Sequence, residues 1–488
     1  MKQKAVLILL IYAIFRINFI PMGHTGDGWG YACEILKHDY FSPHHILYKP
    51  FVAFCSTPFD QFFPFLSPIV FYSQLNLIWG AISLYILFLI LEIINPSNEK
   101  NIWAMMFVAF GFGFIRYSGE NETYILPILF SLLGTFFHFK KANKFWTYLF
   151  LSIAVLFHQI HIFWLLGFGI SEIIQKKNWK PLLISCFAIV LFYIGYAIHY
   201  QITWYTLPFY DVQQRQVTTS LGIKNILFTP INFIRTFIQI HGDILLIINI
   251  YKIYILSISG ILITILLLNF KRVIKYFQSL HSLSLKKTKG SITISNPLII
   301  AILLHFSFAF YSEGNAEFMV MLPLLLIIWF SQSNLLHFQL VKGLTIFIAI
   351  WNTLFFIIPS QQYDFKGIAY ITDKIQAISQ SKTKPVKFIT DNNVLFSNYL
   401  EYKNLTTLYE KMNFKIQSIE EFNNKPNNDL SKFIIVTDAI DNIYSTDRKS
   451  IVSKVENQNW LFNPTYHHRT LAILQPNTAQ KIKITELY

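Results

Sequence analysis

Long apolar runs recur along the first 358 residues, and each is close to the length that crosses a lipid bilayer. A transmembrane helix needs about 20 such residues, because the bilayer core has no water to satisfy exposed backbone groups. Of the 488 residues, 53% are hydrophobic and only 14% are charged, which excludes an ordinary soluble protein. The sequence predicts a polytopic α-helical membrane protein with about 11 transmembrane helices. They are expected near residues 5–21, 69–94, 102–117, 123–138, 145–157, 162–174, 181–200, 246–269, 296–311, 318–330 and 342–358.

Basic residues are concentrated in alternate short loops, as at Lys140 and Lys141 and at Lys176 and Lys177. Such loops remain on the cytoplasmic side, so the N-terminus is expected inside. The formal charge of +14 follows from these loops, and we expect no nucleic-acid partner. The first run has no small-residue cleavage site and is expected to stay in place as a span. The expected location is the bacterial inner (plasma) membrane.

Residues 145–174 test this topology. A single span would put Lys141 and Lys176 on opposite sides of the membrane, whereas two short spans keep both inside. With two spans, the turn from His158 to His161 lies at an outer tip below the membrane surface. Polar groups at that depth need shielding by neighbouring helices or a water-filled cavity.

The composition changes after residue 358. Residues 1–358 are expected to form the transmembrane catalytic domain and residues 359–374 a linker. Residues 375–488 are rich in Lys, Asn and Asp and contain strand-like runs at 386–390 and 433–437, which predict a small α/β domain. Eleven spans that start inside would place this C-terminal domain outside. Of the earlier outer loops, residues 22–68 are expected to form short interfacial helices, and residues 201–245 a mobile lid.

Polar clusters interrupt the apolar sequence where one hydrophobic run ends and the next begins. They are Gly26–Gly28 with Pro43–His45, Arg116–Glu122, His158–His161, Asp211–Arg215 and Glu313–Glu317. The expected topology puts all of them on the outer side of the membrane. Acids and histidines gathered at one membrane face indicate an active site there.

Asp27 follows the first span and is flanked by Gly26 and Gly28. Glycines hold a tight turn and let the backbone approach a ligand, and a carboxylate at this place can act as a general base or a metal ligand. Asp-Gly also favours an ordinary surface turn. The aromatic loop that follows, with His44, His45 and Lys49, favours the functional interpretation.

Glu120 and Glu122 form an acid-x-acid pair at the second outer tip, with Arg116 one helical turn earlier. They suit substrate binding, although acids also stabilise the start of a helix without any ligand, and Arg116 could simply pair with Glu120.

His158 and His161 are three residues apart, so they would share one face of a helix. Glu313 and Glu317 are four apart and would repel each other unless a cation or a substrate hydroxyl lies between them. The histidine spacing suits a metal or a phosphate, and both pairs are expected to bind substrate, as is Arg215 in the long loop. The alternative for each pair is a hydrogen-bonded hairpin tip with no ligand.

Taken together, these features resemble the GT-C glycosyltransferases, the superfamily that includes protein O-mannosyltransferases and lipid A aminoarabinose transferases. The resemblance covers the layout of the whole chain. Asp27 matches the first-loop catalytic acid, and Glu120 and Glu122 match the second-loop acidic pair. Glu317 before Leu322-Pro323 resembles a late outer-loop motif of many bacterial members.

The resemblance implies an inverting glycosyltransferase that moves a sugar from a polyprenyl-phosphate lipid to an external glycan, lipid or protein. A site on the outer face has no access to cytoplasmic sugar nucleotides, so a lipid-linked donor also fits the topology. Asp27 would then be the base. A divalent cation, Mg²⁺ or Mn²⁺, held by Asp27 and Glu122 is left open, because the first-loop motif around Asp27 has one acid where some subfamilies have two.

Two other classes fit a polytopic chain with outer loops. An O-antigen-type polysaccharide polymerase would depend on arginines in those loops rather than on Asp27. A lipid or sugar transporter without bond chemistry should carry its charges at the membrane midplane, in broken helices. The acids here lie at helix ends, which favours an enzyme.

We predict that residue 141 faces the cytoplasm and that residues 375–488 lie outside. In intact cells, an impermeant maleimide should label Asn404→Cys and should leave Lys141→Cys unlabelled until the membrane is opened. Labelling of residue 141 from outside would reverse the topology.

Overall fold

The computed structural model describes residues 2–62, 67–203, 222–240, 252, 256–264, 295–312, 314–362, 368, 372, 387–389, 393–404, 415–417, 433–436, 457–463 and 480–487. The chain divides into two compact units. The helical unit comprises Met1–Ile20 and Asp39–Pro359, and the C-terminal unit comprises Pro21–His38 and Ser360–Tyr488. The segment that contains Asp27 thus belongs to the C-terminal unit. The expected linker and domain limits stay predictions, because most of residues 363–386 lie outside the described part.

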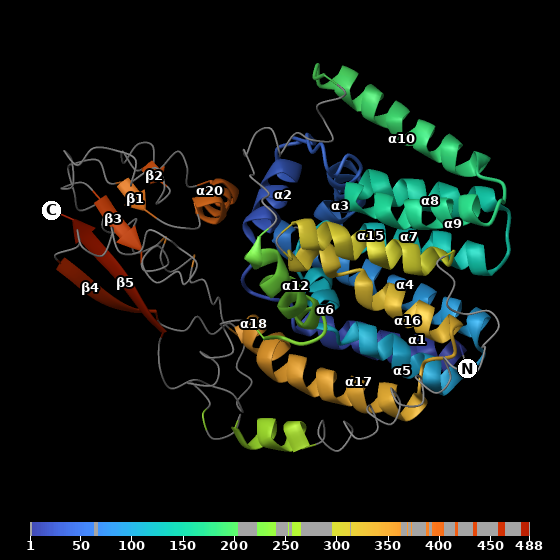
Figure 1. Cartoon of the computed structure of the whole chain (residues 1–488). Coiled ribbons are helices and arrows are strands. Elements are labelled where there is room, and N and C mark those ends of the chain that lie inside the picture. Colours follow the sequence, from blue (N-terminus) through green and yellow to red (C-terminus); the bar gives the residue numbers. More distant parts are fainter. Residues whose placement is uncertain are drawn as a thin grey trace. The chain divides into compact units, whose positions relative to one another are not determined.

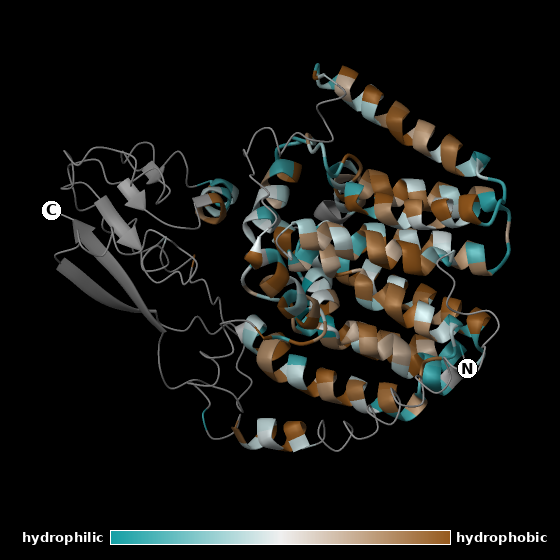
Figure 2. Ribbon diagram, viewed as in Figure 1, coloured by the Kyte–Doolittle hydropathy of each residue, from teal (hydrophilic) through white to brown (hydrophobic). Residues whose placement is uncertain are grey.

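The helical unit is a bundle of apolar helices (Figures 1 and 2). Its helices are α1 (Lys2–Asn18), α3 (Tyr48–Phe62), α4 (Pro68–Ile94), α5 (Asn98–Ala109), α6 (Phe112–Gly119), α7 (Ile125–Phe139), α8 (Lys144–Phe157), α9 (Ile162–Ile174), α10 (Lys180–His199), α12 (Ile223–Arg235), α15 (Pro297–Tyr311), α16 (Leu322–Gln332) and α17 (Phe338–Asn352). Short turns of other helix types, η1 (Gln159–His161), η3 (Ala316–Met319) and η4 (Thr353–Ile357), adjoin α9, α16 and α17.

Three helices in the described part are long and apolar enough to cross a membrane: Pro68–Ile94, Lys180–His199 and Phe338–Gln361. The bent pair α5–α6 would make a fourth span, and several shorter apolar helices accompany them. The prediction of about 11 spans is therefore not confirmed by helix length. The expected helix over residues 246–269 lies largely outside the described residues.

Helices α8 and α9 match the two short helices predicted for residues 145–174, with η1 between them. The prediction for residues 102–117 was wrong in one respect, because the helix breaks between α5 and α6 with a bend of 64°. Gly111 lies at the break, and nothing in the local hydrophobic pattern marks it.

Backbone groups released at this break are satisfied by distant segments. The amides of Phe112 and Gly113 donate to the carbonyls of Phe237 and Thr236, at 3.1 and 3.0 Å. The buried amide of Asn352 donates to Phe110 O at 2.6 Å and to Phe237 O at 2.8 Å. A broken helix is tolerated at membrane depth only when its freed groups find partners in this way.

Glycines allow close packing among the central helices. Helices α7, α8, α9 and α15 lie side by side (Figure 1). A Cβ at Gly167 of α9 would lie 2.7 Å from Ala301 Cβ and 2.8 Å from Pro297 O, both in α15. Small residues at such contacts are typical of membrane helix pairs, which lack a hydrophobic driving force between them.

The C-terminal unit combines a helix pair with a five-stranded mixed sheet. Helix α2 (Gly26–Leu36) packs on α20 (Asn393–Tyr402). The strands are β1 (Lys387–Ile389), β2 (Lys415–Gln417), β3 (Phe433–Val436), β4 (Asn457–Asn463) and β5 (Gln480–Leu487), in the order β2-β1-β3-β5-β4. Strand β1 pairs in parallel with β2 and β3, and β5 pairs antiparallel with β3 and β4. Both runs predicted as strands contain one, β1 and β3.

We predict that Gly167→Ala destabilises the bundle and that Gly195→Ala does not. The methyl group at residue 167 meets backbone of α15, whereas nothing lies within 4 Å of a Cβ at residue 195 of α10. Overpacking of this kind costs about 1–3 kcal/mol. Thermal unfolding in one detergent should show a lower Tm for Gly167→Ala alone. An unchanged Tm for that variant would mean that the α9–α15 contact can yield without loss.

Candidate active site

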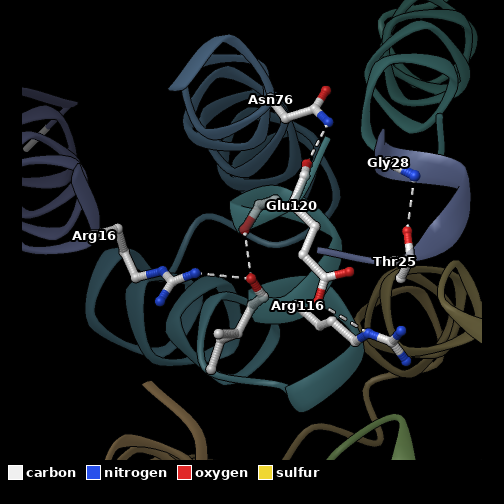
Figure 3. Close-up of polar contacts among 8 residues, drawn as sticks. Arg16, Thr25, Gly28, Asn76, Arg116 and Glu120 are labelled. Atoms are coloured by element: carbon white, nitrogen blue, oxygen red, sulfur yellow. Dashed lines mark hydrogen bonds and ion pairs between the residues drawn. The ribbon is translucent and has the colours of Figure 1, made fainter. Parts of the chain in front are cut away.

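An acidic tip, Glu120–Tyr124, connects α6 to α7 in the helical unit. Its main chain is held by Asn76 of α4, whose Nδ2 donates to Glu120 O at 2.8 Å and to Glu122 O at 2.7 Å (Figure 3). Tyr48 of α3 donates its hydroxyl to Asn121 Oδ1 at 3.2 Å. Burial and the negative charge of Glu122 raise the pKa of Tyr48, so its phenol stays a donor. The tip is thus fixed from two neighbouring helices.

Arg116 and Glu120 form a largely buried ion pair across one turn at the end of α6 (Figure 3). The guanidinium Nε lies 3.2 Å from Glu120 Oε1, and the side chains are 20% and 8% exposed. The guanidinium also lies over the ring of Tyr117, at 5.1 Å from its centre. The charge of Arg116 interacts with those of Glu317 and Glu122 as well. The pairing left open by the sequence is present, and it lies within a larger group of charges.

Glu317, which lies 193 positions after Tyr124 in the chain, also belongs to this group. Its amide donates to Asn315 Oδ1 at 3.0 Å, which starts the short helix η3. Its carboxylate accepts a hydrogen bond from the hydroxyl of Tyr124 at 3.0 Å. Tyr124 packs on Tyr117, with ring centres 4.8 Å apart. The early and late acidic motifs of the sequence therefore meet through Tyr124.

Four histidines named from the sequence lie together beside Tyr124. The ring of His158 is 4.9 Å from that of Tyr124 and 4.4 Å from that of His45. His44 hydrogen-bonds to the side chain of Gln159. His158 lies at the end of α8 and His161 in η1, so the two do not share one helical face as predicted. Their ring centres are 6.4 Å apart.

Two cations near the tip bind main-chain carbonyls. Lys49 is buried and donates to Asp39 O at 3.3 Å and to Phe41 O. Arg16, near the end of α1, is buried and donates through Nη2 to Ile115 O in α6 at 2.8 Å (Figure 3). These hydrogen bonds join main-chain segments of the helical unit, and the predicted role of Lys49 in substrate binding stays a prediction.

Asp27 lies in the first turn of α2, in the C-terminal unit, and its side chain is exposed. The tight turn predicted here was wrong. Thr25 caps a helix, its Oγ1 accepting from Gly28 N at 2.9 Å, and an acid in the first turn stabilises the helix dipole (Figure 3). A Cβ at Gly30 would lie 2.7 Å from Asn398 Nδ2, and that amide donates to Gly26 O at 2.8 Å. Gly26 and Gly30 therefore leave room for α20.

Sequence reasoning missed three members of the site, Asn76, Tyr124 and His305. Asn76 and His305 are fully buried, and the His305 ring lies 6.2 Å from that of His161. A polar residue inside an apolar run was the only available signal. Arg215 and Glu313 were predicted to bind substrate and lie outside the described residues.

The sequence left open a divalent cation held between the carboxylates of Asp27 and Glu122. In the described ranges, no three His, Cys, Asp or Glu side chains are arranged to hold a metal ion. Asp27 and Glu122 belong to different units. A metal shared by these two residues stays a prediction.

Comparison with known proteins identifies a solved structure with a similar fold. No protein-family model and no curated protein matches the sequence. The crystal structure of ArnT from Cupriavidus metallidurans bound to undecaprenyl phosphate is similar over 99% of this chain and 97% of that chain, with a TM-score of 0.51 and 9% sequence identity. ArnT is a GT-C aminoarabinose transferase. This chain has a GT-C-like fold. Its apolar helices and this fold make it an integral membrane protein. The apo state of ArnT from the same organism aligns over the same shares at 9% identity, with a TM-score of 0.40.

The packing of α2 should depend on pH through His24. This side chain is buried against Trp29, and burial lowers its pKa from 6.5 to about 4. Because the folded unit binds the proton less well than the unfolded chain, its stability is complete above about pH 6.5. It falls by up to about 3 kcal/mol as the pH approaches 4.

Hydrogen exchange of residues 21–38 in the full chain, corrected for intrinsic rates, should therefore lose protection on acidification. His24→Phe keeps a ring against Trp29 and should remove this loss, whereas His38→Asn, at an exposed position, should retain it. Equal pH dependence in His24→Phe and the parent protein would assign the effect to another group.

Proposed function

We propose that this protein is an inverting glycosyltransferase that moves a hexosyl or pentosyl group from a polyprenyl-phosphate donor to a glycan, lipid or protein acceptor. One observation supports this most. Tyr117 Oη and Glu120 Oε2 are buried beside Arg116 and have no hydrogen-bond partner among the described residues. Buried polar atoms are nearly always paired, so unpaired ones beside a charge indicate a place for a ligand.

The site offers groups of different kinds for the two parts of a sugar phosphate. Arg116 contributes one positive charge, and Glu120, Glu122 and Glu317 contribute carboxylates that interact with it. A guanidinium can bind phosphate oxygens, and carboxylates can accept hydrogen bonds from sugar hydroxyls. His44, His45, His158 and His161 add further hydrogen-bonding groups on the side of Tyr124. Ionisable groups among apolar helices are costly, and function is the usual reason for them.

The proposed reaction is a single displacement at the anomeric carbon. The acceptor oxygen forms a bond to C1 as the bond from C1 to the phosphate oxygen breaks, and the configuration inverts. Polyprenyl phosphate leaves, and its charge is stabilised electrostatically by Arg116. The proton of the acceptor hydroxyl passes to a base. The sequence resemblance assigns this role to Asp27, whose ordinary pKa of about 3.9 leaves it ionised at neutral pH.

The proposal includes a location. The site would face the outer side of a bacterial inner membrane, where the donor is available as a lipid after translocation. The C-terminal α/β domain would lie on that side as an accessory to acceptor use. The alternation of basic loops supports both statements.

Native mass spectrometry of the purified protein tests the donor class directly. A bound polyprenyl-phosphate sugar, followed by transfer from a synthetic donor of the same kind, would support the proposal. Retention of the lipid without turnover for any acceptor, together with its movement between leaflets of proteoliposomes, would instead indicate a transporter. A long polymer as product would indicate a polysaccharide polymerase.

Asp27→Asn should reduce transfer from a synthetic polyprenyl-phosphate sugar by about 10²–10⁴-fold, the usual contribution of a general base. The variant keeps the shape and removes the base, so donor binding should be unchanged. Glu34→Gln removes another carboxylate from the same helix and should keep parental turnover. With matched expression and Tm, near-normal turnover in Asp27→Asn would leave this residue as a helix-start residue and would move the base elsewhere.

A further inference from the structure

Helix α12 (Ile223–Arg235) exposes its apolar side chains and buries polar ones, which is the reverse of an amphipathic helix in a soluble protein. Its large apolar side chains are exposed by 48% to 73%: Ile223, Ile226, Leu227, Ile231 and Ile234. Its polar side chains Asn225 and Thr229 are buried, at 0% and 1% exposure. A surface helix in water turns its apolar stripe inward. This helix turns it outward.

The polar face of α12 satisfies the end of a neighbouring helix. Asn225 donates through Nδ2 to Phe310 O at 2.6 Å and to Tyr311 O at 3.3 Å. Helix α15 ends at Tyr311, and the last four carbonyls of any helix lack partners within it. The Asn225 side chain also accepts from Gly222 N at 2.9 Å, which fixes the start of α12.

The turn that follows α15 rests on the same face. Asn232 donates through Nδ2 to Gly314 O at 2.8 Å. Gly314 has φ +72, and a Cβ there would lie 2.6 Å from Thr229 N. The turn thus needs glycine for its conformation and for its close approach to the α12 backbone. The hydrogen bonds of this polar face are made to protein.

The apolar face of α12 continues the outer surface of α15. Leu303 and Phe306 of α15 are exposed, and the Phe306 ring lies 6.0 Å from that of Phe233 in α12. Thirteen residues of α-helix extend about 20 Å, which is too short to cross a hydrocarbon core of about 30 Å.

We propose that α12 is an interfacial helix embedded in the leaflet at the C-terminal end of α15, with its apolar face against lipid acyl chains. Lipid is the partner of this apolar face because the face is continuous with that of the apolar helix α15, and because exposed Ile and Leu side chains in water would be unfavourable. The helix closes the carbonyl end of α15 against the bilayer and supports the turn that precedes Glu317. This inference does not depend on the proposed enzymatic activity.

Spin labels can locate the apolar face. Single cysteines at Ile226, Leu227 and Ile231, in a variant whose three native cysteines are alanine, would carry a nitroxide. The protein would be studied in phosphatidylethanolamine–phosphatidylglycerol vesicles. Collisions with oxygen report acyl chains, and collisions with nickel ethylenediaminediacetate report water. Ile184 of α10, which is 68% exposed, serves as the lipid reference, and the exposed Asn404 as the water reference.

We expect oxygen collisions to dominate at residues 226, 227 and 231, as at 184, and nickel collisions to dominate at 404. Dominant nickel collisions at the three sites would put this face in water. Low collision rates with both reagents would mean that protein covers it. Either result would overturn the proposal.

A charge substitution gives an independent test. Leu227 and Val394 of α20 are equally exposed, at 55% each. In vesicles, Leu227→Lys should lower the Tm by several degrees, because a charge is costly among acyl chains. Val394→Lys should leave the Tm unchanged. Equal behaviour of the two variants would count against lipid contact at α12.

Discussion

The structure depends on one constraint, which is that every main-chain carbonyl freed at a helix break must find a donor where water is scarce. Unsatisfied groups in hydrocarbon cost several kcal/mol each. Four asparagine side chains meet this need. They are Asn76 for Glu120 and Glu122, Asn352 for Phe110 and Phe237, Asn225 for Phe310 and Tyr311, and Asn232 for Gly314. An amide offers two donors without a charge, so it can be buried at lower cost than lysine or arginine.

The same constraint shapes the candidate site. One amide, that of Asn76, fixes two carbonyls of the acidic tip, and the carboxylates of Glu120 and Glu122 project from a main chain that cannot easily shift. Precise placement matters for catalysis, since about 1 Å of misplacement can cost about 10²-fold in rate. Tyr124 then connects this tip to Glu317, which lies 193 positions later in the chain. In this tip a neutral amide thus holds the backbone, while the acidic side chains contact Arg116 and Tyr124.

Hydrophobic pattern and loop charge predicted most helix limits well, because the signal for α4, α8, α9 and α10 lies within each segment. The break between α5 and α6 was not predictable, since its partners Asn352, Phe237 and Thr236 are remote in sequence. The start of α2 was misjudged for a related reason. Gly26 and Gly28 suggest a tight turn by themselves, and the packing of Gly26 and Gly30 against α20 is known only from the fold. Glu120, Glu317 and the histidines lie close together in the helical unit, and their role in binding a ligand stays a prediction. Asn76 and His305 are hidden inside apolar runs.

The contacts of α12 also impose an order on the assembly of the protein during its synthesis. Asn225 and Asn232 bind carbonyls that lie 82 to 86 positions later in the chain. At a synthesis rate of roughly 5–20 residues per second, those partners are made several seconds after α12 itself. Until then the side-chain amides of Asn225 and Asn232 lack these partners, so the contacts between α12 and the end of α15 can form only after α15 has been synthesised.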